Sequence, residues 1–153
     1  MAENRSARLV WRDDMMMTGY SANGHTVPLD AAPYAGGHEA GFRPMDLMLT
    51  SLAGCTGMDV ISILRKKRQE FTAFEVSVEG KRQDEHPKVY TEIWVHFTIT
   101  GANVDPAAVE RAIELSRDKY CAAAATLRHT ATLHYDYEII AAEPESPVAE
   151  EAH

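Results

Sequence analysis

The chain has 153 residues, of which 45% are hydrophobic and 25% charged, and a formal net charge of −8. This composition is typical of one soluble globular domain, and nothing in it is basic enough to predict a nucleic-acid partner. No stretch contains the roughly 18 uncharged apolar residues that a membrane span needs, and the first ten residues lack the apolar segment of a signal peptide. We therefore expect a cytoplasmic protein that binds neither nucleic acid nor membrane.

The N-terminal part of the chain is rich in strand and turn signals. Residues 7–13 (ARLVWRD) predict a strand, and Asn-Gly within a turn over 22–25 is a strong hairpin signal. We therefore predict a small meander over 7–30. The Gly- and Ala-rich segment 31–43 that follows is expected to be a surface loop.

The longest helical pattern begins at Pro44 and continues to about Arg68. Proline is favoured at the first position of a helix, and the apolar residues that follow leave few polar positions. A helix that is apolar over most of its circumference is expected at the centre of a fold. Since so short a chain cannot easily cover this helix alone, we predict that a homodimer buries it from both sides.

The C-terminal half alternates between strand and helix patterns. Segments 74–83 and 89–100 alternate polar and apolar residues and predict an antiparallel hairpin with one face on a core. A helix over 107–120 follows, capped by Asp105, and then a short helical piece over 121–129. The last predicted strand spans 130–140.

The predicted order is therefore three strands, a long helix, two strands, helix and strand, which is an α+β fold. We assign residues 1–140 to one domain. Residues 141–153 are acidic and rich in Pro and Ala, so we expect a disordered tail.

The two cysteines, Cys55 and Cys121, are the residues with the clearest chemical potential. A structural disulfide is rare in the cytoplasm, and the chain lacks a CxxC motif. Cys121 is expected at a helix start, which lowers thiol pKa values, whereas Cys55 in mid-helix would need a nearby cation. Gly54 and Gly57 are expected to let a second helix, a substrate or Cys121 approach Cys55. The alternative is a tightly packed helix crossing with an inert cysteine.

The seven histidines do not form a convincing metal motif. His96, His129 and His134 lack HxH or HxxxH spacing, and no carboxylate cluster accompanies them. We therefore predict neither a metal nor another cofactor.

The spacing around the cysteines resembles the OsmC/Ohr family of osmotically inducible and organic hydroperoxide resistance proteins, in its uncharacterised OsmC-like branch. The residues that carry the resemblance are P44-M-D-L-M-L-T-S-L-A-G-C55, K-Y-C121-A-A-A-A-T and the closing strand L-H-Y-D-Y-E-I. It covers about residues 7–140. The resemblance implies an intertwined homodimer in which antiparallel sheets wrap around two long central helices.

The resemblance also implies a chemistry. Cys55 would attack a small hydrophobic hydroperoxide as a thiolate and become a sulfenic acid, and Cys121 would resolve it as a disulfide. A dithiol such as a lipoyl group would then reduce the disulfide.

The family's paired activating residues are not evident in this chain. Its peroxidases carry a Glu directly after the helix-opening proline, where Met45 stands here, and an Arg on or after the first strand, where Met15 stands; Arg12 would match only with a gap. The auxiliary candidates are instead nearby residues: Arg43 as a cation, Asp46 as a poor substitute for the Glu, and His38 with Glu39 in proton transfer.

Two functions of different classes follow from these observations. The first is a thiol-dependent reductase of organic hydroperoxides that uses Cys55 and Cys121. The second is a non-catalytic binding module that holds a small hydrophobic or thiol-reactive ligand in an apolar pocket at the subunit interface.

Overall fold

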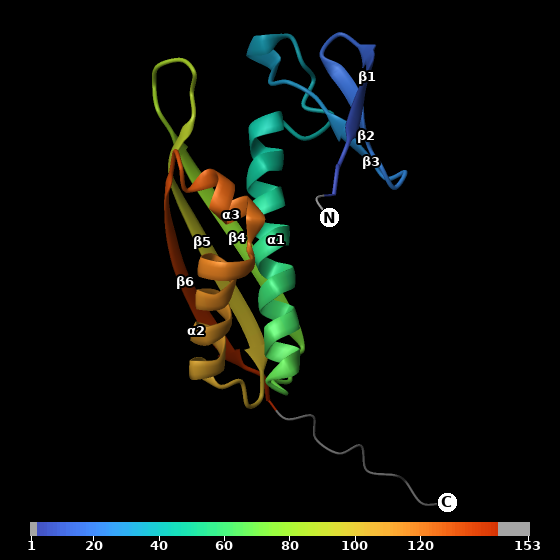
Figure 1. Ribbon diagram of the computed structural model, residues 1–153. Helices are drawn as coiled ribbons and strands as arrows, with labels where there is room; N and C mark the ends of the chain where they lie inside the picture. The colour runs from blue at the N-terminus through green and yellow to red at the C-terminus, as the bar shows by residue number, and fades with distance from the viewer. Residues whose placement is uncertain (1–2, 144–153) are drawn as a thin grey trace, which may run out of the picture. The chain divides into compact units, whose positions relative to one another are not determined.

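The computed structural model of the protein describes residues 3–143. The chain divides into two compact units, Met1–Thr50 and Ser51–His153, and the division falls within the long helix α1 (Pro44–Lys66). The predicted tail over 141–153 lies outside the described residues from position 144 onward. Each unit contains one sheet (Figure 1).

The first unit is built on an antiparallel meander. Its strands are β1 (Ala7–Asp13), β2 (Met16–Ser21) and β3 (Thr26–Leu29), in the order β1-β2-β3. The turn between β2 and β3 uses Gly24 at φ 87°, a left-handed conformation that favours glycine. The predicted meander is thus confirmed. The following loop contains one short 3₁₀ turn, η1 (Pro33–Ala35).

Helix α1 begins at the predicted proline and ends slightly earlier than predicted. Its last turn carries Arg65 and Lys66, whose positive charges suit the negative end of the helix dipole. Arg68 then adopts φ 55°, and the N–H of Gln69 bonds to the carbonyl of Leu64 at 2.9 Å. This left-handed residue ends the helix before the predicted position.

Within one chain α1 is buried along one stripe only. Its buried residues are Leu52, Thr56, Gly57, Val60 and Leu64. Met58, on another face, is 74% exposed. By length and composition alone α1 could span a membrane, a test that core helices of soluble proteins also pass.

The second unit places helices on one face of a three-stranded sheet. The sheet has the order β4-β5-β6, with β4 at Ala73–Arg82, β5 at Tyr90–Gly101 and β6 at Thr132–Ala141. The connection from β5 to β6 contains α2 (Pro106–Leu115), the π-helical turn η2 (Ser116–Tyr120) and α3 (Ala122–Leu127). Figure 1 shows α2 and α3 over the sheet, beside the lower part of α1.

The expectation of purely antiparallel sheets is wrong for this unit. Strands β4 and β5 form the predicted antiparallel hairpin, but β5 and β6 are parallel. The helical connection explains the difference, because it carries the chain back along the sheet before β6 begins. Antiparallel neighbours need only a tight turn, whereas parallel neighbours need such a crossover.

The core of this unit follows the predicted alternation. The apolar residues of β5 that face the helices are fully buried: Ile93, Val95, Phe97 and Ile99. Val109 of α2 is fully buried as well. As predicted, Asp105 caps α2, accepting a hydrogen bond from the N–H of Ala107 at 3.0 Å. The result is a mixed α+β fold with two sheets and helices.

Candidate functional site

The fold brings the two cysteines together with one carboxylate. The Sγ atoms of Cys55 and Cys121 and a carboxylate oxygen of Asp59 all lie within 4.8 Å of one another. Cys55 and Asp59 come from α1, while Cys121 precedes α3. Both cysteines are free thiols; Cys55 is partly exposed and Cys121 is buried. The site therefore combines two thiols with an acid inside the second unit.

Local backbone structure fixes the position of Cys121. The π-helical turn η2 ends when Cys121 adopts an extended conformation, φ −73° and ψ 102°, with its N–H bonded to the carbonyl of Ser116 at 2.8 Å. Its Sγ then accepts a hydrogen bond from the N–H of Ala124 at 3.4 Å and so caps α3. Because backbone holds both the N–H and the sulfur, Cys121 has little freedom to move away from Cys55.

A hydroxyl network holds Asp59. The hydroxyl of Ser116 donates to Oδ2 of Asp59 at 2.9 Å, and the Oγ1 of Thr56 lies 2.8 Å from Ser116 Oγ. Thr56 and Ser116 are fully buried. The network joins α1 to η2 and orients the carboxylate toward the sulfurs.

The environment disfavours a thiolate at Cys121. Burial is the main cause that raises the pKa of Cys121 to about 11, and the neighbouring Cys55 and Asp59 raise it further, while the bond from the Ala124 N–H opposes them. A sulfur that leaves water loses the solvation of its anion. The expectation that the helix start makes Cys121 a thiolate is thus wrong, because burial outweighs one N–H from a helix of six residues.

A second polar group lies close to Cys121. The hydroxyl of Tyr135, on β6, is buried and has no hydrogen-bond partner within residues 3–143. Burial and the nearby Cys121 raise the pKa of Tyr135 to about 12, against the effect of Arg117 and Arg128. The side chains of Tyr135, Arg117 and Arg128 line a cavity of about 300 Å³. The phenol therefore stays protonated at neutral pH.

The auxiliary residues predicted from sequence lie in the first unit, away from the division at Ser51. Arg43 and Glu39 form an ion pair. Both line a hollow of about 690 Å³ together with Asp46. The predicted cation thus has a carboxylate partner close in sequence, and its part in the thiol chemistry remains a prediction.

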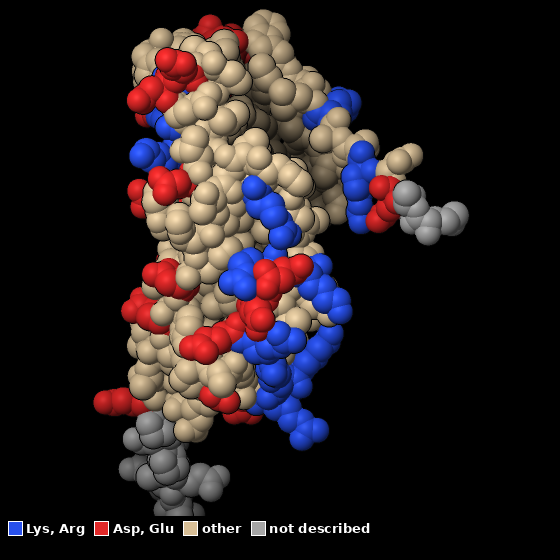
Figure 2. Space-filling model, turned by 60° about the vertical axis from the view of Figure 1, so that its left-hand side comes forward, with Lys and Arg blue, Asp and Glu red and all other residues tan. Residues whose placement is uncertain are grey.

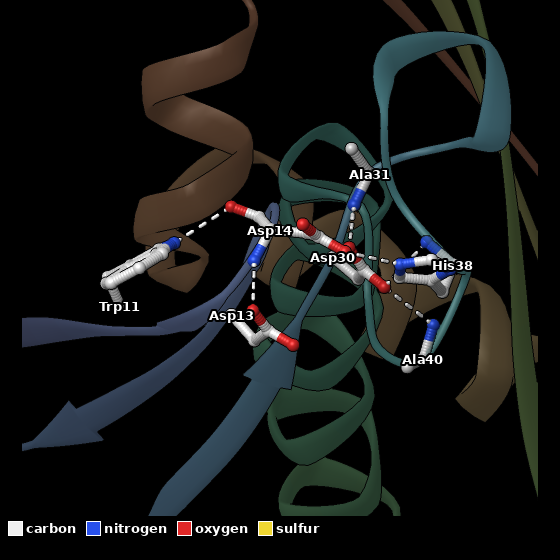
Figure 3. Close-up of polar contacts among 7 residues, drawn as sticks. All are labelled: Trp11, Asp13, Asp14, Asp30, Ala31, His38 and Ala40. Carbon is white, nitrogen blue, oxygen red and sulfur yellow. Dashed lines mark hydrogen bonds and ion pairs between the residues drawn. The ribbon is translucent and has the colours of Figure 1, made fainter.

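His38 belongs to a carboxylate-rich loop of the same unit. The ring Nε2 of His38 lies 2.8 Å from Oδ2 of Asp14. The backbone N–H of His38 donates to the carboxylate of the buried Asp30, which also accepts hydrogen bonds from the backbone N–H groups of Ala31 and Ala40 (Figure 3). The hydrogen bond to Asp14 is the main cause that raises the pKa of His38. The carboxylates of Asp30 and Asp14 therefore hold this loop in place through hydrogen bonds.

Arg12, which would match the family's arginine only with a gap, is held by two hydroxyl groups. Arg12, on β1, donates to the hydroxyls of Thr18 and Tyr20 on β2. These bonds cross the meander between neighbouring strands. Its partners are neutral hydroxyls, which differs from the Arg–Glu pair that the resemblance implies.

Sequence reasoning missed Asp59, Ser116 and Thr56. Asp59 follows Cys55 by four positions, and such residues lie on the same face of a helix. This Cys-x3-Asp spacing is a signal that could have found the carboxylate. No comparable signal exists for Ser116, because its contact with Asp59 depends on how α2 and η2 pack against α1.

Charged side chains are mixed on the molecular surface. The face drawn in Figure 2 carries Lys and Arg side chains next to Asp and Glu side chains. The basic run at the end of α1, residues 65–68, is followed by Glu70. The expectation that nucleic acid is not a partner remains a prediction.

The chain is similar to known proteins in both sequence and structure. A family model for OsmC-like protein matches residues 36–136. Protein YhfA of Escherichia coli (strain K12) is 38% identical over 136 residues, which cover 89% of this chain and 98% of that protein. A hypothetical protein from Aquifex aeolicus VF5 has a similar structure, with a TM-score of 0.82, 31% identity and coverage of 93% of this chain and 100% of that chain.

A more distant structure bears a functional name. An organic hydroperoxide resistance protein OsmC from Legionella pneumophila aligns with a TM-score of 0.67 and 11% identity, covering 93% of this chain and 99% of that chain. At this identity the likeness concerns the fold alone.

Proposed function

The chain belongs to the OsmC-like protein family, and from this membership we propose that it reduces organic hydroperoxides through a reversible Cys55–Cys121 disulfide. The observation that carries the proposal is the approach of the two sulfurs to within 4.8 Å. A disulfide needs about 2.05 Å between the sulfurs, and side-chain rotation can supply the remaining approach. The substrate class follows from the resemblance to the OsmC/Ohr family, and a protein named for organic hydroperoxide resistance shares this fold.

Exposure and pKa support different roles for the two thiols. Cys55 is partly exposed and is the thiol that a substrate can reach, whereas Cys121 is 2% exposed. With its pKa raised to about 11, Cys121 is protonated at neutral pH and a poor first nucleophile. Cys55 is therefore the attacking residue and Cys121 the resolving residue.

The reaction proceeds in three balanced steps. The Cys55 thiolate attacks one peroxide oxygen, so the O–O bond breaks, an alcohol leaves after protonation, and Cys55 becomes a sulfenic acid. The Cys121 sulfur attacks the Cys55 sulfur, forming the S–S bond and releasing water. An external dithiol, such as a lipoyl group, then transfers two electrons and two protons, and both thiols are restored. A cytoplasmic location would keep this reductant available.

A homodimer is part of the proposal. Met58 and Met48 of α1 are 74% and 41% exposed, although they belong to an apolar helix. A second copy that packs its own α1 against these residues would bury them, as the family's two long central helices imply. Arg43, Asp46, His38 and Glu39 are the candidates for auxiliary roles.

Peroxide turnover tests the proposal. Reduced protein with excess dihydrolipoamide is expected to consume cumene hydroperoxide, Cys55→Ser to consume none, and Cys121→Ser to react once without recycling. A matched control is Thr50→Ala, an exposed hydroxyl substitution on another face of α1. Equal consumption by wild type and Cys55→Ser would refute the assignment.

A binding function is the second candidate, and a specific hollow favours it. The meander forms an apolar hollow of about 450 Å³, lined among others by Leu9, Val27, Leu29 and Leu47. A small hydrophobic ligand would fit this volume. If the thiols are inert to peroxide, saturable binding of such a ligand that Leu9→Arg abolishes would identify this function instead.

A further inference from the structure

We propose that reduced Cys55 and Cys121, together with Asp59, form a site for a thiophilic divalent cation, with Zn²⁺ as the probe. Three donor atoms from two separate helices converge within 4.8 Å of one another. The inference does not depend on peroxide chemistry, because it requires only the reduced thiols and the carboxylate.

The donor set suits zinc. Zn²⁺ binds thiolate sulfur at about 2.3 Å and carboxylate oxygen at about 2.1 Å in tetrahedral geometry, so neighbouring donors sit about 3.5–3.8 Å apart. The observed limit of 4.8 Å requires an inward movement of about 1 Å, which rotation of the Cys55 and Asp59 side chains can provide. Three protein ligands leave the fourth position open for water or an added thiol.

The second layer of the site is already in place. Metal-bound carboxylates and imidazoles are usually oriented by outer hydrogen bonds. Here the Ser116 hydroxyl donates to Oδ2 of Asp59 at 2.9 Å and is itself bonded to Thr56. This leaves the other carboxylate oxygen available to a cation. The backbone N–H of Ala124 orients the Cys121 sulfur at 3.4 Å in the same way.

The charge of the site also favours a cation. Within residues 3–143, Asp59 forms no ion pair, and one of its carboxylate oxygens lies within 4.8 Å of both sulfurs. A group of one carboxylate and two potential thiolates repels further negative charge, and a divalent ion would neutralise most of it. Asp59 also lines a hollow of about 350 Å³, together with Lys66 and Lys67.

Binding is a ligand exchange without electron transfer. Two Zn–S bonds and one Zn–O bond form, two thiol protons and the displaced waters leave, and no atom changes oxidation state. A bound ion would engage one lone pair on each sulfur and so slow their oxidation. The consequence is a reversible protected state of the thiol pair.

Metal titration of the reduced chain without an affinity tag tests the proposal. Zn²⁺ is added in competition with a chromogenic chelator, and Co²⁺ is added separately to detect thiolate charge-transfer absorption. We expect one ion per chain and a strong Co²⁺ thiolate band. Loss of a metal ligand is expected to weaken binding at least about tenfold in Cys55→Ser, Cys121→Ser and Asp59→Asn.

The controls separate this site from others. Glu75→Gln changes an exposed carboxylate on β4 and is expected to bind Zn²⁺ like the wild type, and Asp59→Glu is expected to recover binding partly. Thermal unfolding of the metal-free variants verifies that each is folded. Zn²⁺ affinity that is unchanged in Asp59→Asn or in either Cys→Ser variant would overturn the proposal. A separate assay of peroxide turnover in chelator keeps the two proposals distinguishable.

Discussion

The Sγ atoms of Cys55 and Cys121 lie within 4.8 Å of each other, although they come from different helices. The pair is asymmetric, because Cys55 is partly exposed while Cys121 is buried and capped onto α3. This asymmetry supports an assignment of distinct roles, one thiol for the substrate and one for the disulfide. It also leads to a first prediction on reactivity.

Cys121 should be nearly unreactive in the folded chain at pH 8. In a Cys55→Ser variant with chelator present, burial still raises the pKa of Cys121 above its ordinary value of 9.0, although the contribution of Cys55 is gone. A raised pKa lowers the thiolate fraction, so alkylation by iodoacetamide should be at least about tenfold slower than in urea. Equal rates in both conditions would contradict the burial argument.

The same shift predicts a dependence of stability on pH. Because the folded-state pKa of Cys121 lies above the unfolded one, its contribution is fully present below about pH 9 and is lost as the pH rises toward about 11. Urea unfolding of the wild type and of Cys121→Ala between pH 8 and 10.5 measures the difference. A gap between the two that widens with pH would contradict the sign.

Ser116 should stabilise the fold through its buried hydroxyl. Ser116→Ala leaves Asp59 and Thr56 without their common partner, which should lower the free energy of unfolding by about 1–3 kcal/mol. Ser77→Ala, an exposed substitution on β4, should change it by less than about 0.5 kcal/mol. Equal effects of the two substitutions in urea titrations would show that the network does not contribute.

His38 should titrate above its ordinary range. Its hydrogen bond to Asp14 raises its pKa, so this contribution to stability is full below about pH 6.5 and fades as the pH rises through the raised pKa. Proton NMR of the imidazole measures the titration. Asp14→Asn should return the pKa toward 6.5, and an unchanged titration would argue against the contact.

Met58 tests the proposed dimer. A residue that is 74% exposed on α1 can accept a charge in a monomer, but Met58→Glu would place that charge in the proposed interface. Sedimentation velocity should therefore show a wild-type dimer and a weakened or monomeric variant, while Met58→Leu remains dimeric. A monomeric wild type, or a dimer unaffected by the glutamate, would contradict the proposal.

Sequence alone predicted the elements well because their signals are local. The meander, the proline that begins α1, the hairpin and the Asp105 cap all depend on neighbouring residues. The parallel pairing of β6 with β5 could not be read in this way, because it depends on how the helical connection packs. An alternating pattern has the same period in parallel and antiparallel neighbours.

The candidate site could be predicted only in part, because some of its features depend on tertiary packing. The two cysteines were recognised by their spacing within a familiar order of elements, but their surroundings were not. Gly57 makes room for β4 rather than for Cys121, since a Cβ there would lie 3.2 Å from Val76 Cγ2, and a Cβ at Gly54 would meet no atom within 4 Å. Burial of Cys121 and the convergence of Asp59 arise from tertiary packing, which no short motif encodes.

The most direct test of the account is the product of one reaction with peroxide. Reduced, chelator-treated protein is mixed with one equivalent of cumene hydroperoxide and analysed by intact mass and peptide mapping. The account predicts rapid loss of both thiols, a mass lower by about 2 Da for two hydrogens lost in one S–S bond, and a peptide that links Cys55 to Cys121 within one chain. Two thiols that remain free and unmodified would contradict it.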